Sequence, residues 1–160
     1  MSFILRQPGP GDIGFVIHRH GVLYNLEYGW DWTFEALVAT VASEFILKFD
    51  GAHECCRIAE AGGRVVGSAF VVRSGTPGIA KLRLVYVEPE MRGTGLGQAL
   101  VEECMSFSRA ARYTRMKLWT NDVLLPARRL YHRLGFVMTA TEPYRGFGHD
   151  LVGETWERDL

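Results

Sequence analysis

Residues 84–97, LVYVEPEMRGTGLG, join an apolar strand to the start of a helix through a glycine-rich loop. Pro89 ends the strand, and Gly93, Gly95 and Gly97 permit backbone conformations that let the chain pass close to a ligand. Arg92 adds a positive charge beside the free N–H groups of the helix start. An ordinary turn needs one or two glycines, so the segment predicts a phosphate-binding loop.

The composition indicates one globular domain over residues 1–160. The chain is 48% hydrophobic, and its 18 Lys and Arg residues balance 18 Asp and Glu residues. The basic residues between 109 and 133 alternate with apolar positions, which is typical of a solvated helix face and argues against a nucleic-acid partner. There is no apolar stretch of the roughly 20 residues that a membrane span requires, and no signal peptide pattern. We therefore expect a cytoplasmic protein with no membrane partner.

The cysteines do not indicate a metal site. Cys55 and Cys56 are adjacent, and Cys104 falls on the apolar face of a predicted helix, so we expect buried, reduced thiols. Zinc would need further ligands at suitable spacing, and His18 with His20 offers only two.

Hydrophobic periodicity and turn residues predict alternating strands and helices. Asp12 caps a first helix running toward residue 20, and Asp31 or Thr33 caps a second one that extends to about Phe49. Between them lies an aromatic, acidic segment, residues 24–32. The expected strands are residues 4–7, 54–61, 64–73, 79–87, 116–120, 136–141 and 151–159, and two further helices begin at about residues 96 and 126. The order predicts an α/β fold with one mixed sheet and a parallel crossover through the helix after the glycine loop.

Glycine spacing excludes two familiar phosphate loops. A nucleoside triphosphate loop ends in Gly-Lys-Ser/Thr, whereas Gly97 is followed by Gln98. A dinucleotide loop requires a later third glycine and follows the first strand of a parallel sheet. Neither pattern is met.

Two motifs carry a resemblance to a known family. Arg92-Gly93-Thr94-Gly95-Leu96-Gly97 matches Arg-x-x-Gly-x-Gly, and residues 127–136, ARRLYHRLGF, match Ala-x-x-Leu-Tyr-x-x-x-Gly-Phe. With these motifs the chain resembles the GNAT superfamily of acetyl-CoA-dependent N-acyltransferases. The resemblance implies a three-layer fold with a central sheet of six to seven strands flanked by about four helices. Residues 18–31 and 147–160 also resemble the acetyltransferase half of bacterial proteins that fuse a MarR-type regulator to a GNAT domain.

The resemblance implies a coenzyme A site. The pyrophosphate would lie on backbone amides of residues 93–98, and the pantetheine arm would run beside the 79–87 strand. The family places an amide side chain seven residues before its tyrosine. That position is Leu124 here, so Asn121 is the substitute. The expected cofactor-binding residues are Val85, Tyr86, Val87, Arg92, Gly93, Thr94, Gly95, Leu96, Gly97, Gln98, Asn121 and Arg128.

The resemblance also implies how the reaction is catalysed. Tyr131 matches the general acid that protonates the leaving thiolate, and an N–H near Val85 or Tyr86 would stabilise the oxyanion. An alkylamine with a pKa of about 10 is only roughly a thousandth unprotonated at pH 7, so a base or a water relay is needed. Some family members use a glutamate early in the strand, where this chain has Lys81. The open candidates for the base are His20, Glu27, Tyr28 and His149, with His149 preferred.

The acceptor is expected to be a primary amine of a small molecule. Contacts are predicted from His20, Tyr24, Glu27, Tyr28, Trp30 and Arg83. The sequence leaves two alternatives open for part of this segment, an aromatic, acidic cup for a cationic amine or a buried aromatic cluster with solvated acids, formed by Tyr24, Tyr28, Trp30 and Trp32 beside Glu27 and Asp31. Arg83 shares a strand face with Lys81, which also suits a carboxylate on the acceptor. The alternatives are an acyl-CoA sensor without catalysis and a protein or peptide N-acetyltransferase. The resemblance also makes a homodimer an expectation.

Overall fold

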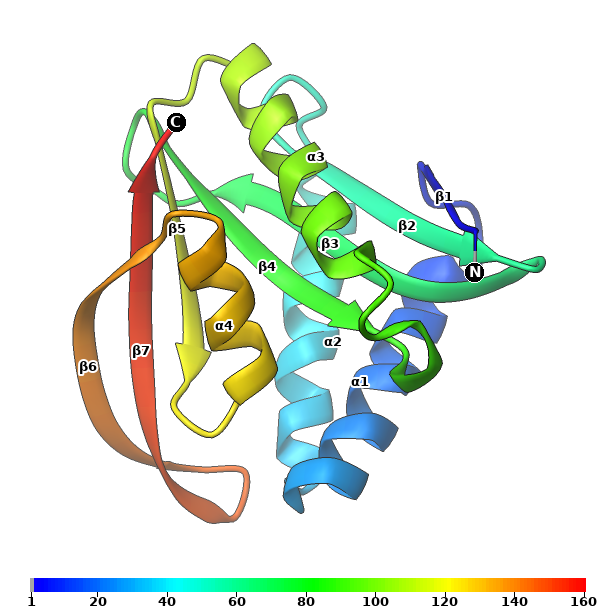
Figure 1. Ribbon diagram of the computed structural model, residues 1–160, viewed down its shortest axis with the longest axis vertical. Coiled ribbons are helices and arrows are strands. Elements are labelled where there is room, and N and C mark those ends of the chain that lie inside the picture. Colours follow the sequence, from blue (N-terminus) through cyan, green and yellow to red (C-terminus); the bar gives the residue numbers. More distant parts are fainter. Residues whose placement is uncertain (1) are drawn as a thin grey trace.

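A computed structural model describes residues 2–160 and contains a mixed seven-stranded sheet with helices on both faces (Figure 1). The strand order is β1-β2-β3-β4-β5-β7-β6. The strands are β1 (Ile4–Arg6), β2 (Cys55–Ala61), β3 (Arg64–Arg73), β4 (Ile79–Val87), β5 (Arg115–Asn121), β6 (Val137–Gly146) and β7 (His149–Asp159). The α-helices are α1 (Asp12–Tyr28), α2 (Trp32–Leu47), α3 (Leu96–Ala110) and α4 (Leu125–Arg133). The predicted sheet, helices and element order are confirmed.

The only parallel pair among the described strands is β4 with β5, which α3 connects. All the other neighbouring strands pair antiparallel. A parallel pair needs a crossover connection, and the amphipathic α3 provides it while covering one face of the sheet. The predicted crossover is confirmed.

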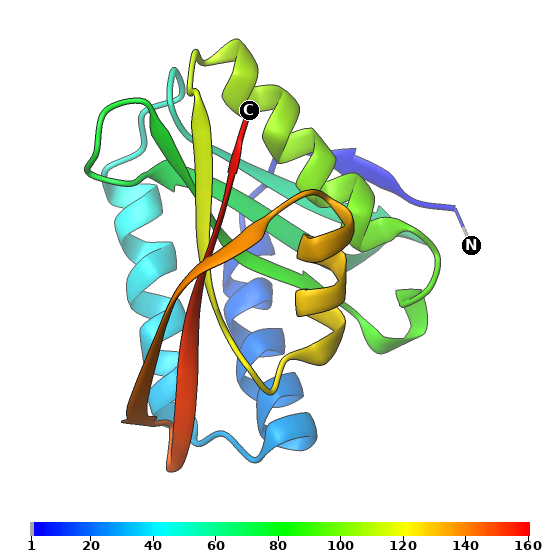
Figure 2. The same cartoon turned by 60° about the vertical axis from the view of Figure 1, so that its left-hand side comes forward.

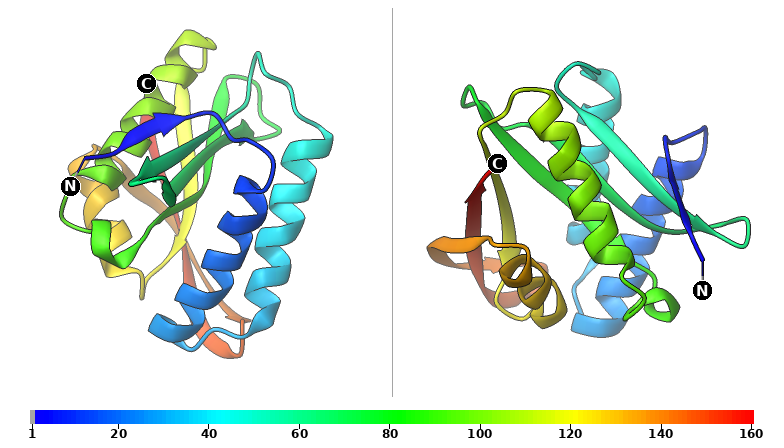
Figure 3. Two further views of the ribbon diagram at one scale, coloured as in Figure 1. Left: turned by 90° about the vertical axis from the view of Figure 1, so that its right-hand side faces the viewer. Right: turned by 45° about the horizontal axis from the view of Figure 1, so that its top comes forward.

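The helices form two outer layers around the sheet (Figures 2 and 3). α3 and α4 pack on one face, where the largest buried cluster contains Leu100, Cys104 and Tyr131. α1 and α2 lie together on the other face, over a second cluster that contains Val16 and Phe45. Each layer supplies one wall of the site described below.

The first helix differs from its prediction at both ends. α1 continues to Tyr28, so only residues 29–31 separate it from α2, and most of the expected aromatic segment is helical. Its N-cap is Gly11, while the Asp12 carboxylate accepts hydrogen bonds from Arg6 and from the Gly9 N–H. The Asp31 cap is confirmed, because the Asp31 carboxylate accepts a hydrogen bond from the Thr33 N–H. α2 ends at Leu47, before Phe49, which lies in the following loop.

The three cysteines are buried and free, as expected from their apolar surroundings. Burial raises the pKa of the Cys56 thiol, so it stays protonated at neutral pH. Within residues 2–160 no helix is long and apolar enough to span a membrane.

A bulge in β4 decides which side chains reach which face of the sheet. Phe70 pairs with Arg83 and Ser68 with Tyr86, so β4 has one residue more than β3 between these pairs. Leu84 takes a left-handed conformation there, with φ 49°. Before the bulge Ala80 and Leu82 face α3, and after it Val85 and Val87 do. The extra residue thus shifts the alternation by one.

β4 and β5 pair only over their first halves. The ladder ends at Leu82 opposite Leu118, although β4 continues to Val87 and β5 to Asn121. The arrowheads of the two strands diverge in Figure 1. The edge of β4 beyond Leu82 therefore has no neighbouring strand on that side.

A buried ion pair holds the end of β4 to α1. The Arg19 guanidinium donates two hydrogen bonds to the Glu88 carboxylate, at 2.7 and 2.8 Å, and Glu88 is only 3% exposed. Glu88 immediately precedes the glycine loop, so the pair fixes where that loop begins.

We expect the Arg19→Met variant to lose about 3 kcal/mol of unfolding free energy, because it leaves a buried carboxylate without its partner. Arg64→Met is the matched control. The Arg64–Glu90 pair spans 3.4 Å between exposed side chains, and its loss should change stability by less than about 1 kcal/mol. Urea unfolding of both variants measures the difference. Equal losses would contradict the assignment of Arg19 and Glu88 as an anchor.

Candidate active site

A cavity of about 540 Å³ opens where β4 and β5 part. Its walls come from the C-terminal half of α1, the end of β4, the glycine loop and α4. The lining residues are Leu23, Tyr24, Glu27, Tyr28, Val85, Tyr86, Val87, Met91, Arg92, Gly93, Gly95, Leu96, Gly97, Gln98, Leu124, Pro126, Ala127, Arg129, Leu130, Tyr131 and Arg133. Nine of the twelve residues predicted to bind the cofactor lie on this surface, and Tyr131 lies there with them.

The glycine loop leaves room for an anion. Gly93 has φ 76° and Gly95 has φ 86°, and a Cβ at either position would meet no atom within 4 Å. Gly95 is the N-cap of α3 and has no side chain to occupy the free N–H groups of the first turn. Free amides, open space and a helix N-terminus suit a phosphate.

Thr94 belongs to the loop but does not line the cavity. Its hydroxyl donates a hydrogen bond to the Met91 carbonyl at 2.6 Å. The backbone N–H of Thr94 donates to the same carbonyl at 3.4 Å, so residue 94 closes the turn before α3.

Arginines surround the loop, although one of them is not the arginine expected. Arg129 and Arg133 line the cavity from α4, whereas Arg128 points away and donates a hydrogen bond to the buried Glu154 at 2.9 Å. The structure does not place Arg128 with the cofactor residues, because its guanidinium is held by that carboxylate. The four-residue spacing of Arg129 and Arg133 on a helix indicated that they share a face.

The third arginine at the loop, Arg92, forms an ion pair with Glu27. Its carboxylate lies 2.5 Å from the Arg92 guanidinium, which brings the end of α1 to the start of the loop. A bound phosphate would compete with Glu27 for Arg92 and would be repelled by the carboxylate.

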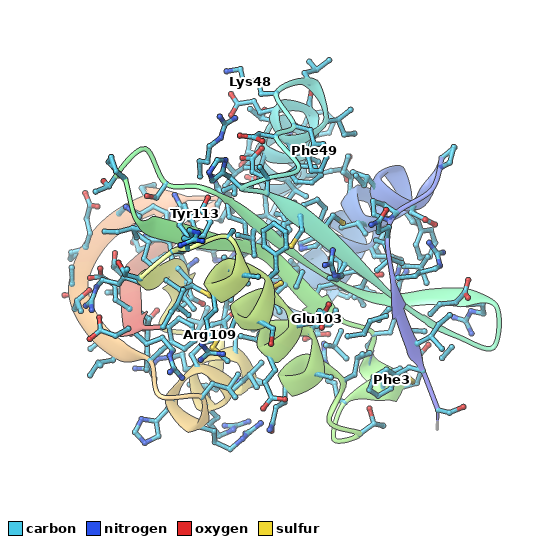
Figure 4. All side chains as sticks on the ribbon, turned by 90° about the horizontal axis from the view of Figure 1, so that it is seen from above. Phe3, Lys48, Phe49, Glu103, Arg109 and Tyr113 are labelled. Atoms are coloured by element: carbon cyan, nitrogen blue, oxygen red, sulfur yellow. The ribbon has the colours of Figure 1, made fainter. Side chains whose placement is uncertain are left out.

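Glu27→Gln should therefore tighten coenzyme A binding, by about threefold to tenfold, since it removes one like charge and frees Arg92. Glu103→Gln is the matched control, because Glu103 lies on α3, pairs with Arg57 and is outside the cavity (Figure 4). Isothermal titration calorimetry at low salt measures both dissociation constants. Weaker binding by Glu27→Gln would show that the pair organises the loop instead.

A second, smaller cavity of about 120 Å³ adjoins the first. It lies between α2 and the diverging strands, and five residues line both cavities: Tyr24, Val85, Leu124, Ala127 and Tyr131. Of the residues predicted to contact the acceptor, His20, Trp30 and Arg83 line this second cavity, whereas Glu27 and Tyr28 line only the first. The predicted acceptor set is thus divided between the two.

Tyr131 lies at the junction of the two cavities. It is 6% exposed, and burial raises its pKa, so the phenol is protonated at neutral pH. Its hydroxyl makes no hydrogen bond to any other residue from 2 to 160, which leaves the proton available to a ligand. Val85 and Tyr86 lie across the same junction.

His20 is buried in the aromatic wall of the second cavity. Its ring stacks on Tyr24 with 5.7 Å between centroids, and burial lowers its pKa to about 4. Nδ1 donates its proton to the Val16 carbonyl at 2.8 Å, which leaves the Nε2 lone pair of a neutral imidazole. His20 is thus packed among aromatic rings and also lines the second cavity.

His149 is placed away from both cavities, contrary to the preference for it as the base. It begins β7, and its Nε2 bonds the Gly29 carbonyl at 2.9 Å. In the hairpin turn beside it, the Phe147 ring packs on Trp30 with 4.9 Å between the ring centroids. The Asp31 N–H donates a hydrogen bond to the Phe147 carbonyl. His149 therefore tethers the β6–β7 hairpin to the α1–α2 connection.

The expected aromatic cup is largely a packed cluster. Trp30 is 2% exposed and contacts the rings of Tyr24, Tyr28, Phe34 and Phe147, while Trp32 is 84% exposed. Asn121 is buried in the second cavity, where its side-chain oxygen accepts a hydrogen bond from the Tyr144 hydroxyl. Asn121 therefore lines only the second cavity, whereas Leu124 lines both.

An anion-binding loop, an unpaired strand edge and a buried phenol at a cavity junction define the site of an enzyme that uses a phosphate-bearing carrier. The model of the Acetyltransferase (GNAT) family matches residues 22–136. The chain belongs to this family of N-acetyltransferases, and its cofactor is acetyl-CoA. The arginines and the open glycine loop fit the phosphates of that molecule.

Two curated relatives and one solved structure illustrate the likeness. An uncharacterized N-acetyltransferase of Schizosaccharomyces pombe is 38% identical over 76% of this chain and 73% of its own length. Human N-acetyltransferase 8B is 34% identical over 53% of the chain, which corresponds to only 39% of that protein. The structure of a ribosomal-protein-alanine N-acetyltransferase from Brucella melitensis has a TM-score of 0.78 and 19% identity, covering 98% of this chain and 99% of that one. It shares the fold.

Proposed function

We propose that this enzyme transfers the acetyl group of acetyl-CoA to a primary amine of a small molecule by direct attack of the amine on the thioester. The observation that carries the proposal is the meeting of two cavities of different size at Tyr131. The larger one has the phosphate-binding loop, and the smaller one has no such feature. The amine of an acceptor in the smaller cavity would meet the thioester of acetyl-CoA in the larger cavity at Tyr131.

The chain's own groups would hold the carrier at both ends. Loop amides of residues 93–98, with Arg92, Arg129 and Arg133, bind the phosphates. The unpaired edge of β4 from Val85 to Val87 binds the amide groups of the arm as a neighbouring strand would. When bound, acetyl-CoA supplies a thioester carbonyl that an amine attacks and a thiolate that departs.

Three groups would act on the reacting atoms. A backbone N–H of Val85 or Tyr86 stabilises the oxyanion, and Tyr131 donates its proton to the departing sulfur. His20 replaces His149 as our candidate base, because its neutral imidazole lines the acceptor cavity. It accepts the proton that the amine loses, directly or through water.

We expect His20→Asn to lower kcat by about tenfold, less than a general base usually contributes, because a pKa of about 4 makes a weak base. His149→Asn should leave kcat within twofold. Thiol release at saturating acetyl-CoA measures both, and thermal melts check that each variant is folded. The reverse order of effects would restore His149 as the base.

The proposal is tested by thiol release with a broad panel of amines and of peptides with free N-termini. Release with small amines supports it. Release with peptides alone would favour protein or peptide acetylation, and coenzyme A binding without release would favour an acyl-CoA sensor. We also propose that the protein is a cytoplasmic homodimer, and size-exclusion chromatography with light scattering would test its oligomeric state. A relationship to the MarR-type regulator fusions is a further proposal, which a wider sequence comparison would test.

A further inference from the structure

Two cations line the acceptor cavity without a carboxylate partner. Lys81 and Arg83 lie two residues apart on β4, so their side chains leave the same face of the sheet, before the bulge at Leu84. Neither forms an ion pair within residues 2–160. The charges that act on them are Glu44, Lys117 and each other, and Glu44 lies on the exposed surface of α2.

The surroundings make this an unusual place for two positive charges. Both side chains are half-buried, and burial lowers the pKa of each. Lys117, which is paired with Lys81 across the β4–β5 ladder, adds a third positive charge, and Glu157 lies opposite it on β7. Like charges gathered in a half-buried site cost free energy unless an anion joins them.

The rest of the lining is mostly apolar, with His20, Thr120 and Asn121 as its buried polar members. Facing the two cations are aliphatic and aromatic side chains of α2 and β5: Phe34, Leu37, Val38, Val41, Leu118 and Trp119. Trp30 and His20 close the end that is shared with Tyr24. A ligand that fills this space has an anionic group at one wall and an apolar group at the other.

From this we infer that the acceptor is an amine that also carries a carboxylate, such as an amino acid with an apolar side chain, and that Arg83 and Lys81 bind that carboxylate. The inference rests on the proposed function, which places the amine at Tyr131. Arg83 and Val85 line the same small cavity and are two residues apart, at most about 7 Å of backbone, so one small molecule can contact both the guanidinium and the reaction centre. Arg83 has the planar, two-pronged donor geometry that a carboxylate accepts.

The experiment compares amines that differ only in the carboxylate. Phenylalanine is paired with phenethylamine and leucine with isopentylamine, and kcat/KM is measured for each by thiol release. The variants are Arg83→Met and Lys81→Met/Arg83→Met. Lys48→Met is the matched control, since it removes an exposed cation at the end of α2 that lines neither cavity.

We expect the wild type to prefer the carboxylated member of each pair by at least tenfold, and the double variant to lose that preference through a higher KM. A second readout needs no acetyl-CoA: calorimetry should detect binding of N-acetylphenylalanine to the wild type and at least tenfold weaker binding to the double variant. Equal use of both amines by the wild type, with unchanged product binding in the variant, would overturn the inference while leaving the proposed function intact. No release with any amine would instead count against the proposed function, and the calorimetric arm would still decide whether the cations bind a carboxylate.

Discussion

Replacing Tyr131 by phenylalanine is expected to lower kcat by about 100-fold while changing coenzyme A affinity by less than twofold. The phenol is buried at the junction of the two cavities, is protonated at neutral pH and has no hydrogen-bond partner among the described residues. The substitution removes only the oxygen and keeps the ring, whose centroid lies 5.9 Å from that of Phe136. The loss should therefore appear in the chemical step.

Tyr144→Phe is the matched control for the loss of a phenol. Tyr144 donates to Asn121 but lines neither cavity, so its variant should keep kcat within about twofold. Thiol release under saturating conditions gives kcat, and calorimetry gives the dissociation constant of coenzyme A. Because the pKa of Tyr131 is raised, ionisation of this residue should produce no loss of rate below pH 10 in the wild type. An undiminished kcat in Tyr131→Phe would assign the residue to packing alone.

Replacing Gly95 by valine is expected to weaken coenzyme A binding by at least about 100-fold. Gly95 has φ 86°, which a β-branched residue adopts only at a cost of about 1–3 kcal/mol, and the valine side chain would stand in the space left for the phosphates. Relief of the strain would turn the loop amides away from the ligand. Affinity measured by calorimetry reports both effects.

Gly75→Val is the control that distinguishes the effect of backbone strain on stability from the loss of coenzyme A binding. Gly75 has φ 88°, and a Cβ at this position would meet no atom within 4 Å, as at Gly95. Gly75 lies in the β3–β4 connection, outside both cavities. The two variants should lose similar unfolding free energy, while only Gly95→Val loses coenzyme A. Retained affinity in Gly95→Val would contradict the assignment of the loop.

Local sequence patterns predicted the elements because each depends on nearby residues. The Gly62-Gly63 turn, the Asp31 cap and the apolar repeat of α3 act within a few positions, and the structure contains all three features. The predicted end of α1 was wrong because it depends on a contact outside that range. α1 extends over Tyr24 and Tyr28 because their rings pack against Trp30, a contact that periodicity does not reveal.

The positions of His149 and His20 relative to the cavities could not be predicted from the sequence, for a different reason. Both are single histidines near aromatic residues, and sequence carries no information on which one faces a cavity. The hairpin turn at residues 146–148 docks on the α1–α2 connection, which places His149 against the Gly29 carbonyl. Arg128 was likewise chosen from a motif, whereas Glu154 on β7 decides its direction.

The sequence by itself determined the glycine loop, the order of the elements and the position of Tyr131, because loop conformation and helical or strand periodicity are local properties of the chain. Only the tertiary structure decided that β4 and β5 separate after Leu82, that after the bulge at Leu84 Val85 lines both cavities whereas Arg83 lines only the smaller one, and that Tyr131 lies where the two cavities meet. These features depend on strand register and on packing between distant segments, which fix the direction of a side chain only once the sheet is assembled.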